Sequence, residues 1–457
     1  MKGGLKKFYK ALAILLLIGI GFPCWAEYPG VLIIAHGSPS EEWNEPVREA
    51  VDKVALPYPV KLAFLEFVEG EGIQDKIDEF EEEGIVDSIL PVPLFISTFS
   101  GHIEEIKYIL GQREMPPEGA EDLIPVVTDL KILPLTSALD DHPLVADILS
   151  DRVKELSKFP SEEIVVITAH GAETEEDLIK WNENIESLAA RIKWELGVKD
   201  VRYGYLFEGI EPYLRDVVEE AISEGDVIVV PLLISSGYFT KTKIPKILSG
   251  LMEGISYNEK PLVAHEDIAK WIELTASAPL VKLPPISIYD REQGLLEITL
   301  DEVRKPEPMC CCRVNAFRVC QEAFSHLWKG EIPVRDDIFI ISLHPSHGHE
   351  EAFDYITKAA SRGDYLVGLP RGTSIKNITE ENYIFGVYKK SENRFAILTL
   401  KDDVFPKRFL EFRNWIRPKI KDGTATEAQK RAFISAKMDF IDRILVTEEP
   451  YKILIFH

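Results

Sequence analysis

The chain has 457 residues, of which 46% are hydrophobic and 28% are charged, which is enough apolar material for two or three globular cores and excludes a disordered chain. Acidic residues outnumber basic ones by 76 to 52, so the formal net charge is -24 at pH 7. This charge argues against nucleic acid and anionic membrane as partners, and a polycarboxylate ligand would need a local basic patch.

The first 26 residues have the layout of a secretory signal peptide. Four lysines precede an uncharged run over 11–23, which ends shortly before the small residue Ala26. The run is short for a membrane span of about 20 residues. We therefore expect cleavage after Ala26, a periplasmic or other extracytoplasmic location, and no membrane span in the mature chain. Loss of the four lysines would change the net charge to -24 - 4 = -28. An uncleaved anchor is the alternative.

Apolar strands alternate with amphipathic helices over 27–140. The expected strands begin at Val31, Val60, Ser88 and Leu123, and the expected helices cover 43–54, 73–83, 102–112 and, beyond the module, 142–157. Unbroken apolar strands between amphipathic helices predict a parallel sheet that is covered on both faces.

The same order of elements begins again at Ile164, within a second module over 141–278. Three motifs recur, namely Ala35-His36-Gly37 with Ala169-His170-Gly171, Pro93-Leu94-Phe95-Ile96-Ser97 with Pro231-Leu232-Leu233-Ile234-Ser235, and Gly101-His102 with Gly237-Tyr238. Their offsets are 134, 138 and 136 residues, and such near-constant offsets favour duplication. The sequence thus predicts an α/β protein with two tandem flavodoxin-like modules.

Prolines mark 279–308 as a connection to a third, smaller α+β domain over 309–457. This domain concentrates soft and borderline metal ligands, namely Cys310, Cys311, Cys312, Cys320, His344, His347 and His349. The set suits a structural zinc or other transition-metal ion. Because no CxxC pair occurs, a disulfide between Cys320 and one of the triplet, with the histidines exposed in a loop, is the alternative.

Two histidines stand where an open α/β sheet binds its ligands. His36 follows the first strand and His102 follows the third, each beside a glycine. Ligands bind beyond the carboxyl ends of the strands where the strand order reverses, and in a 2-1-3-4 order these two strands are neighbours. We therefore expect both imidazoles to reach one crevice. A structural role is the alternative for each histidine.

These motifs resemble those of the sirohydrochlorin cobaltochelatases and related class II tetrapyrrole chelatases, over both modules. The matching segments are His36-Gly37-Ser38, Phe64-Leu65-Glu66, and Val92-Pro93-Leu94-Phe95 followed by Gly101-His102. The resemblance implies insertion of a divalent metal, cobalt before iron or nickel, into a sirohydrochlorin-like tetrapyrrole, as in cobalamin biosynthesis. It also implies that His36 and His102 hold the metal and that Glu66 helps to accept the pyrrole protons.

The second module departs from this pattern. Tyr238 stands where the second histidine would be and Ala172 replaces the serine, and an imidazole with a phenol of pKa about 10 makes a poor divalent site. We therefore expect one metal site, in the first module, with the second module as the other wall of a tetrapyrrole cleft. A core or capping role is the alternative for His170. The expected tetrapyrrole contacts are Ser38, Tyr238, Lys241, Lys243 and Lys246, and a solvated helix face is the alternative for the lysines.

The leading functional prediction is an exported chelatase, a lyase of unassigned oligomeric state. A periplasmic metal- or haem-binding protein that uses the same pocket without turnover is the alternative, and a redox or sensor protein built around the cysteines is a third interpretation. The C-terminal domain resembles in part the E-type subunit of formylmethanofuran dehydrogenase, through Gly348-His349 and the upstream cysteines. Glu350 and Glu351 follow where that family has Cys-Pro. This resemblance implies a metal-binding accessory domain.

Overall fold

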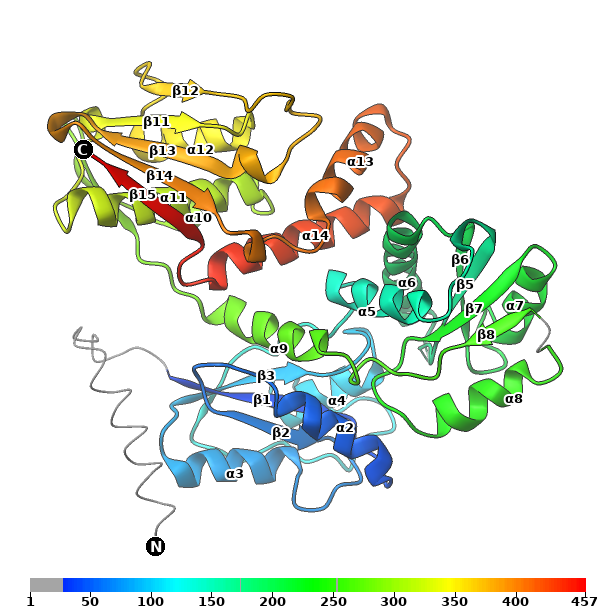
Figure 1. The fold of residues 1–457 in the computed structure, drawn as a ribbon. Helices are drawn as coiled ribbons and strands as arrows, with labels where there is room; N and C mark the ends of the chain where they lie inside the picture. The colour runs from blue at the N-terminus through cyan, green and yellow to red at the C-terminus, as the bar shows by residue number, and fades with distance from the viewer. Residues whose placement is uncertain (1–27, 173, 252–253) are drawn as a thin grey trace, which may run out of the picture.

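The computed structural model describes residues 28–172, 174–251 and 254–457, so the predicted signal peptide lies outside the described residues. The described chain forms two parallel-sheet modules and a C-terminal domain with a mixed sheet (Figure 1). The predicted architecture is therefore confirmed. Within the described ranges, no helix has the length and apolar character needed to cross a membrane.

The first module is a four-stranded parallel sheet with the predicted strand order. Its elements are β1 (Pro29–Ala35), α2 (Glu41–Val51), β2 (Val60–Phe64), α3 (Ile73–Glu83), β3 (Ser88–Pro93), α4 (Gly101–Ile109) and β4 (Lys131–Ile132). The order is β2-β1-β3-β4, and β1 and β3 are buried along their whole length, as their unbroken apolar runs predict. The fourth strand, which was expected to begin at Leu123, is limited to the two residues of β4. The residues before it satisfy their backbone elsewhere, since Val127 N donates to the Gln74 side chain and Val126 N donates to the Ile109 carbonyl.

The second module repeats this topology. Its elements are α5 (Pro143–Lys154), β5 (Glu163–Ala169), α6 (Glu175–Leu196), β6 (Asp200–Tyr205), α7 (Leu214–Ile222), β7 (Asp226–Pro231), a π-helical turn (Phe239–Lys243), α8 (Ile244–Leu248), β8 (Ile255–Tyr257) and α9 (Asp267–Ser277). The strands run parallel in the order β6-β5-β7-β8, which matches the first module strand for strand.

The modules exchange their last helices. Helix α5 packs against β7 and α6 of the second module, whereas α9, from the end of the second module, packs against β3 and α2 of the first. Leu149 of α5 and Trp271 of α9 are buried in one apolar cluster that spans both modules. The two helices also begin alike, because His142 and His265 each accept, at Nδ1, the amide two residues ahead at 3.2 Å. This shared cap is a further sign of duplication.

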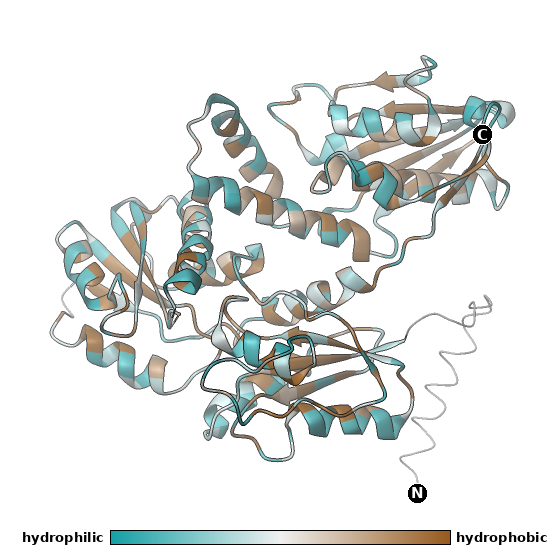
Figure 2. Ribbon diagram, turned by 180° about the vertical axis from the view of Figure 1, so that it is seen from behind, coloured by the Kyte–Doolittle hydropathy of each residue, from teal (hydrophilic) through white to brown (hydrophobic). Residues whose placement is uncertain are grey.

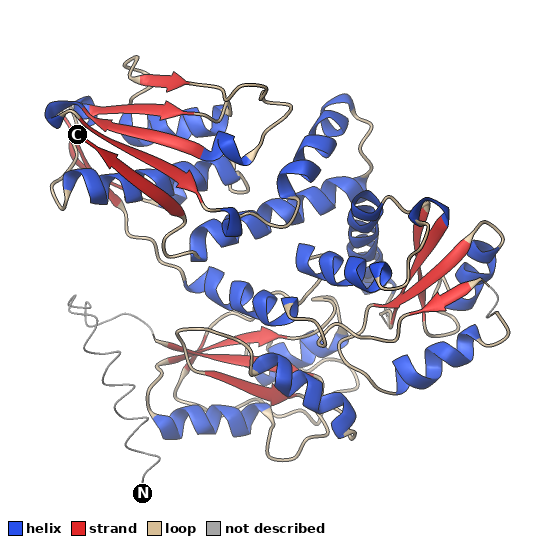
Figure 3. Ribbon diagram, viewed as in Figure 1, coloured by secondary structure: helices blue, strands red, loops and turns tan. Residues whose placement is uncertain are grey.

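The C-terminal domain has a five-stranded sheet in the order β12-β11-β13-β14-β15, antiparallel except for β11 with β12 (Figure 3). Helices α11 and α12 pack against its strands. The elements are β9 (Ile286–Asp290), β10 (Gly294–Ile298), α10 (Leu300–Arg304), α11 (Cys311–Trp328), β11 (Ile338–Ser342), α12 (His347–Thr357), β12 (Tyr365–Val367), β13 (Ile384–Lys389), β14 (Arg394–Leu400), α13 (Phe409–Asp422), α14 (Glu427–Val446) and β15 (Tyr451–Phe456).

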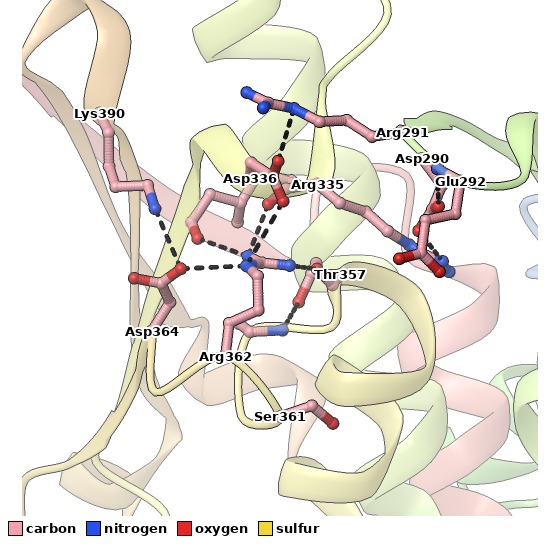
Figure 4. A network of polar contacts seen from close by, with 12 residues as sticks. Asp290, Arg291, Glu292, Arg335, Asp336, Thr357, Ser361, Arg362, Asp364 and Lys390 are labelled. Carbon is pink, nitrogen blue, oxygen red and sulfur yellow. Dashed lines mark hydrogen bonds and ion pairs between the residues drawn. The ribbon is translucent and has the colours of Figure 1, made fainter.

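The segment 279–308, expected to be a connection, contains the β9–β10 hairpin and α10, and it belongs to the C-terminal domain. Ile286 and Ile298 of the hairpin are buried in that domain's core. An ion pair of 2.7 Å joins Asp290 at the end of β9 to Arg335, whose guanidinium also donates to the last carbonyls of α12 (Figure 4). The domain therefore begins about 20 residues earlier than the prolines suggested.

Helix α14 connects the C-terminal domain to both modules. It packs against α5, α6 and α9, and Figure 1 shows it reaching from the mixed sheet toward the second module. Ser435 Oγ donates to the Asp141 carbonyl at 3.0 Å, and Arg431 forms an ion pair with Glu186 at 3.0 Å. Figure 2 shows apolar residues concentrated on the strands, which is where the cores lie.

Candidate functional site

The two predicted histidines meet at the carboxyl edge of the first sheet. His36 directly follows β1, His102 is the second residue of α4 just beyond β3, and these two strands are neighbours. The ring centroids lie 4.5 Å apart. His36 Nδ1 donates to the Gly37 carbonyl at 2.8 Å, so Nε2 is the nitrogen of His36 that can bind a metal.

Glu66 follows β2 and lies beside this pair. Its amide donates to the His36 carbonyl at 2.9 Å, which fixes the two strand ends to each other. Gly37 makes this approach feasible, because it has a φ of +89° and a Cβ there would collide with the Glu66 carbonyl oxygen. One ligand atom from each of Glu66, His102 and Glu105 falls within 4.8 Å of the others. The edge therefore gathers two imidazoles and two carboxylates.

Glu105 is a member of the site that the sequence analysis missed. It lies one turn after His102 in α4, and its Oε2 accepts from His102 Nδ1 at 2.9 Å. This hydrogen bond lowers the pKa of Glu105 against the opposing effect of partial burial, and the charges of His102 and His36 lower it further. A carboxylate that accepts from one imidazole nitrogen orients the ring and makes the other nitrogen a better ligand. The i,i+3 spacing was the available signal.

Aromatic side chains surround His36. The rings of Phe67, Trp43 and Phe95 lie at centroid distances of 5.9, 6.4 and 6.4 Å, and Phe67 is 61% exposed. Ser38 lies in the turn before α2, where its carbonyl accepts from Asn44 Nδ2 at 2.8 Å. An exposed aromatic ring beside the histidines offers a surface on which a flat macrocycle can stack.

The corresponding edge of the second module has a different chemistry. The amides of Leu65 and Leu206 donate to Ala35 and Ala169, which places Phe207 at the position of Glu66. By the offset of 136 residues, Tyr238 takes the position of His102 and Lys241 that of Glu105. Only the histidine after the first strand is shared.

His170, the shared histidine, packs among aromatic rings. Its ring lies 4.6 Å from Phe207 and 5.4 Å from Phe239, centroid to centroid. The residues that take the positions of His102, Glu66 and Glu105, namely Tyr238, Phe207 and Lys241, offer neither a second imidazole nor a carboxylate beside His170. The second module therefore keeps the frame of the site without its ligands.

One of the predicted substrate-binding residues of the second module, Lys241, contacts the first module. Lys241 forms an ion pair with Glu42 of α2, and Ser235 Oγ donates to the Trp43 carbonyl at 2.7 Å. Lys243 Nζ lies 5.3 Å from the centre of the Phe207 ring. Tyr238 is 63% exposed. The structure thus places Lys241 at the junction of the modules, whereas Lys243 and Tyr238 contact Phe207 and Phe239 of the second module. Their role toward a ligand stays a prediction.

Three of the predicted C-terminal ligands come together. Cys312 of α11, His344 after β11 and His349 of α12 each offer a ligand atom within 4.8 Å of the others. Burial lowers the pKa of His344 to about 3, with help from Arg413 and Arg417, and burial holds the pKa of His349 well below its usual range. Both imidazoles are therefore neutral at neutral pH, as metal ligands must be.

The structure does not bring Cys320 and His347 to this cluster. Cys320 lies in the apolar core, eight residues beyond Cys312 on α11, which is about 12 Å along a helix. Cα atoms joined by a disulfide lie within about 7 Å, so the alternative of a disulfide between Cys320 and the triplet is wrong. The side chain of His347 is 78% exposed and pairs with Glu351 at 2.9 Å.

Comparisons with solved structures show distant likenesses. SirB from Bacillus subtilis with Fe3+ is 16% identical, covers 54% of this chain and 94% of its own, and gives a TM-score of 0.43. CbiX, the terminal enzyme for biosynthesis of siroheme in denitrifying bacteria, is 19% identical over 55% of this chain and 98% of its own, at 0.40. DR2241 from Deinococcus radiodurans, a multi-domain protein with structural similarity to chelatases, is 16% identical over 63% and 61%, at 0.41.

No curated protein matches the sequence. A family model, however, matches twice in tandem. The CbiX model covers residues 30–156 and again 164–280, which together make up more than half of the chain, and each match contains one parallel sheet, the first with α5 and the second with α9. The chain therefore belongs to the CbiX family.

Proposed function

We propose that the first module inserts a divalent metal, cobalt first among the candidates, into a sirohydrochlorin-like tetrapyrrole. Membership of the CbiX family supports insertion of a metal into a tetrapyrrole as the general activity. The observation that carries the proposal is the pair of imidazoles at the carboxyl edge of the sheet, whose ring centroids lie 4.5 Å apart, with Glu66 and Glu105 beside them.

In this proposal the protein holds the metal substrate and takes up protons. Insertion forms four metal–nitrogen bonds in the macrocycle and releases two pyrrole protons. His36 and His102 hold the incoming ion through exchangeable bonds, because imidazole suits cobalt, nickel and iron. Glu66 is exposed beside the pair and accepts one proton as the metal enters the ring, and the second proton passes to solvent. Glu105 orients His102.

The macrocycle would lie over this edge, toward the second module. Phe67 and Tyr238 offer exposed rings for stacking, and Ser38 lies at the start of the adjoining helix. Lys243 supplies charge for the carboxylates, and Lys241 can do so once it leaves Glu42. A ligand with several carboxylates would thus meet the local basic patch that the overall negative charge requires.

The test compares equivalent histidines of the two modules. His36→Ala and His170→Ala remove the residue after the first strand of each sheet. Each protein is incubated with sirohydrochlorin and Co(II), Ni(II) or Fe(II), and insertion is followed by the absorption spectrum. We expect His36→Ala to lose at least ~100-fold in rate and His170→Ala to keep the parent's rate. A His36→Ala protein with the parent's rate contradicts the proposal.

The alternative of a periplasmic metal- or haem-binding protein is favoured by one observation, the loss of ligands from the second module. In that case the parent would change its absorbance on adding metal without consuming free tetrapyrrole. Export is part of both proposals and rests on residues 1–26. Fractionation of cells that express the full chain, with N-terminal sequencing of the mature protein, tests cleavage after Ala26.

A further inference from the structure

A buried cluster of one thiol and two imidazoles lies in the C-terminal domain, outside the chelatase modules. Cys312 is on the first turn of α11, His344 follows β11, and His349 is on the first turn of α12. His344 is 2% exposed and His349 is fully buried. Three elements that are separate in sequence therefore converge on one point with metal-ligating side chains.

One nitrogen of this cluster has no hydrogen-bond partner. His349 Nε2 lies 3.0 Å from the Asn315 side-chain amide, which is itself fixed by the Tyr451 hydroxyl at 2.8 Å. His349 Nδ1 is buried, and no side chain or backbone group in the described part of the chain bonds to it. A buried polar atom is rarely left unpaired, so this nitrogen marks a position for a ligand, and it can bind a metal when the ring proton is on Nε2 and Asn315 presents its amide oxygen there.

Around Cys312, the start of α12 packs closely against the start of α11. Cys312 Sγ accepts from Ser346 Oγ at 3.2 Å, a contact that stabilises a thiolate. A Cβ at Gly348 would lie 3.0 Å from Cys310 Sγ and 3.3 Å from Cys312 Cβ. The glycine therefore allows α12 to pack directly on the start of α11, which brings a second thiol beside the cluster.

We propose that Cys312, His344 and His349 bind a borderline divalent cation of the zinc and cobalt class, with Cys312 as the one thiolate ligand. One thiolate and two imidazoles are ligands that Zn2+ and Co2+ accept, whereas Mg2+ and Ca2+ require oxygen. On binding, the Cys312 thiol loses its proton to solvent and a sulfur–metal bond forms. Neither the modules nor the tetrapyrrole contribute to this site, so a test of this site does not depend on whether the first module is a chelatase.

Cobalt spectroscopy distinguishes the two sites. The full chain is reduced, stripped of metal and titrated with Co(II). A cobalt ion bound by a thiolate gives a near-ultraviolet charge-transfer band, which the cysteine-free site of the first module cannot produce. We expect the parent and the His36→Ala variant to show this band, and the Cys312→Ser variant to lose it. Cys320→Ala, which removes a thiol that lies outside the cluster, and His347→Ala, on the same helix as His349, are the matched controls and should keep it.

A second variant keeps the inference testable if Cys312→Ser is poorly folded. Asn315→Ala removes the support of His349 and leaves all ligands in place, and we expect about 10-fold weaker cobalt binding. The absence of the band from the folded parent, or its persistence in a folded Cys312→Ser protein, overturns the proposal. Loss of insertion activity in His36→Ala with the band retained would leave both proposals standing.

Discussion

The two modules have the same strand order and share the histidine after the first strand, but the other side chains at the carboxyl edge of the sheet differ. In the first, His36 stands among His102, Glu66 and Glu105, and the edge gathers ligands. In the second, a tyrosine, a phenylalanine and a lysine occupy those three positions, and His170 packs among aromatic rings. The comparison teaches that this fold supplies positions at the strand ends, whereas the chemistry depends on a few side chains placed there.

The largest effect is expected when the first module receives the residue of the second. In His102→Tyr, a phenol of ordinary pKa about 10 replaces an imidazole, so divalent metal is no longer held by two nitrogens. We expect metal insertion to fall by at least ~100-fold, measured by absorption with sirohydrochlorin and Co(II). The exposed Tyr289→His, a reverse exchange far from this edge, should change nothing. A His102→Tyr enzyme that retains turnover would remove the contrast between the modules.

The reciprocal change tests whether the backbone at the edge of the second sheet can still position metal ligands. The triple variant Phe207→Glu, Tyr238→His, Lys241→Glu restores at the second edge the residue types of the first. We expect equilibrium dialysis to find one more Co(II) ion per chain than in the parent. The same variant with His170→Ala is the control and should bind no extra ion. If the triple variant binds no additional Co(II), the backbone of the second edge differs from that of the first as well as the side chains.

A smaller effect is expected from Glu105, whose counterpart in the second module is a lysine. Glu105→Gln keeps the shape of the side chain and weakens the hydrogen bond that orients His102. Loss of such a supporting partner lowers metal affinity by about 10-fold. Isothermal titration with Co(II) measures the change. Glu104→Gln, the neighbour that pairs with Lys107 instead, should keep the parent's affinity.

The exchanged helices α5 and α9 differ in one buried acidic residue, which should make stability depend on pH. Asp147 lies five residues after the capping histidine of α5, and Lys270 holds that place in α9. Burial, and next the charge of Glu195, raise the pKa of Asp147 well above its usual range. Folding then favours the protonated acid, so this residue's contribution to stability is present at low pH and is lost as the pH rises above the ordinary value of about 4.

The variant Asp147→Asn should therefore flatten the pH dependence of stability. We expect it to unfold at a higher temperature than the parent at about pH 8, by an amount equivalent to about 1–3 kcal/mol, and at a similar one at about pH 4. Lys270→Gln is the control in the equivalent helix. Thermal unfolding followed by circular dichroism checks the difference between the two pH values. A parent-like pH profile in Asp147→Asn would show that the buried acid is not the source.

Much of the first site was accessible from sequence because strand ends are easy to locate. Unbroken apolar runs before His36 and near His102 placed both residues at one edge once the strand order was assumed, and the structure has that order. Glu105 was missed because its role depends on the helical turn that begins at Gly101, which sets it above His102. A spacing of three residues means little until the start of the helix is known.

Other features were missed because prolines and amphipathic helices do not specify their tertiary partners. The prolines of 279–308 suggested a connection, yet the β9–β10 hairpin forms there, since Ile286 and Ile298 find apolar partners in the C-terminal core. Nothing in an amphipathic helix states which sheet it will cover, so the exchange of α5 and α9 was not foreseen. In the same way, clustering of cysteines in sequence gave no means to separate Cys312 from Cys320.

The exchange of helices also makes each repeat necessary for the packing of the other. The sheet face beside Val31 and Val92 is closed by Trp271 and its neighbours, which the chain reaches only after passing through the whole second repeat. A shortened gene that ended at residue 140 would leave that apolar face in water. The second repeat thus supplies α9 as the cover of the first sheet, and this packing places no demand on the side chains at the strand ends of the second repeat.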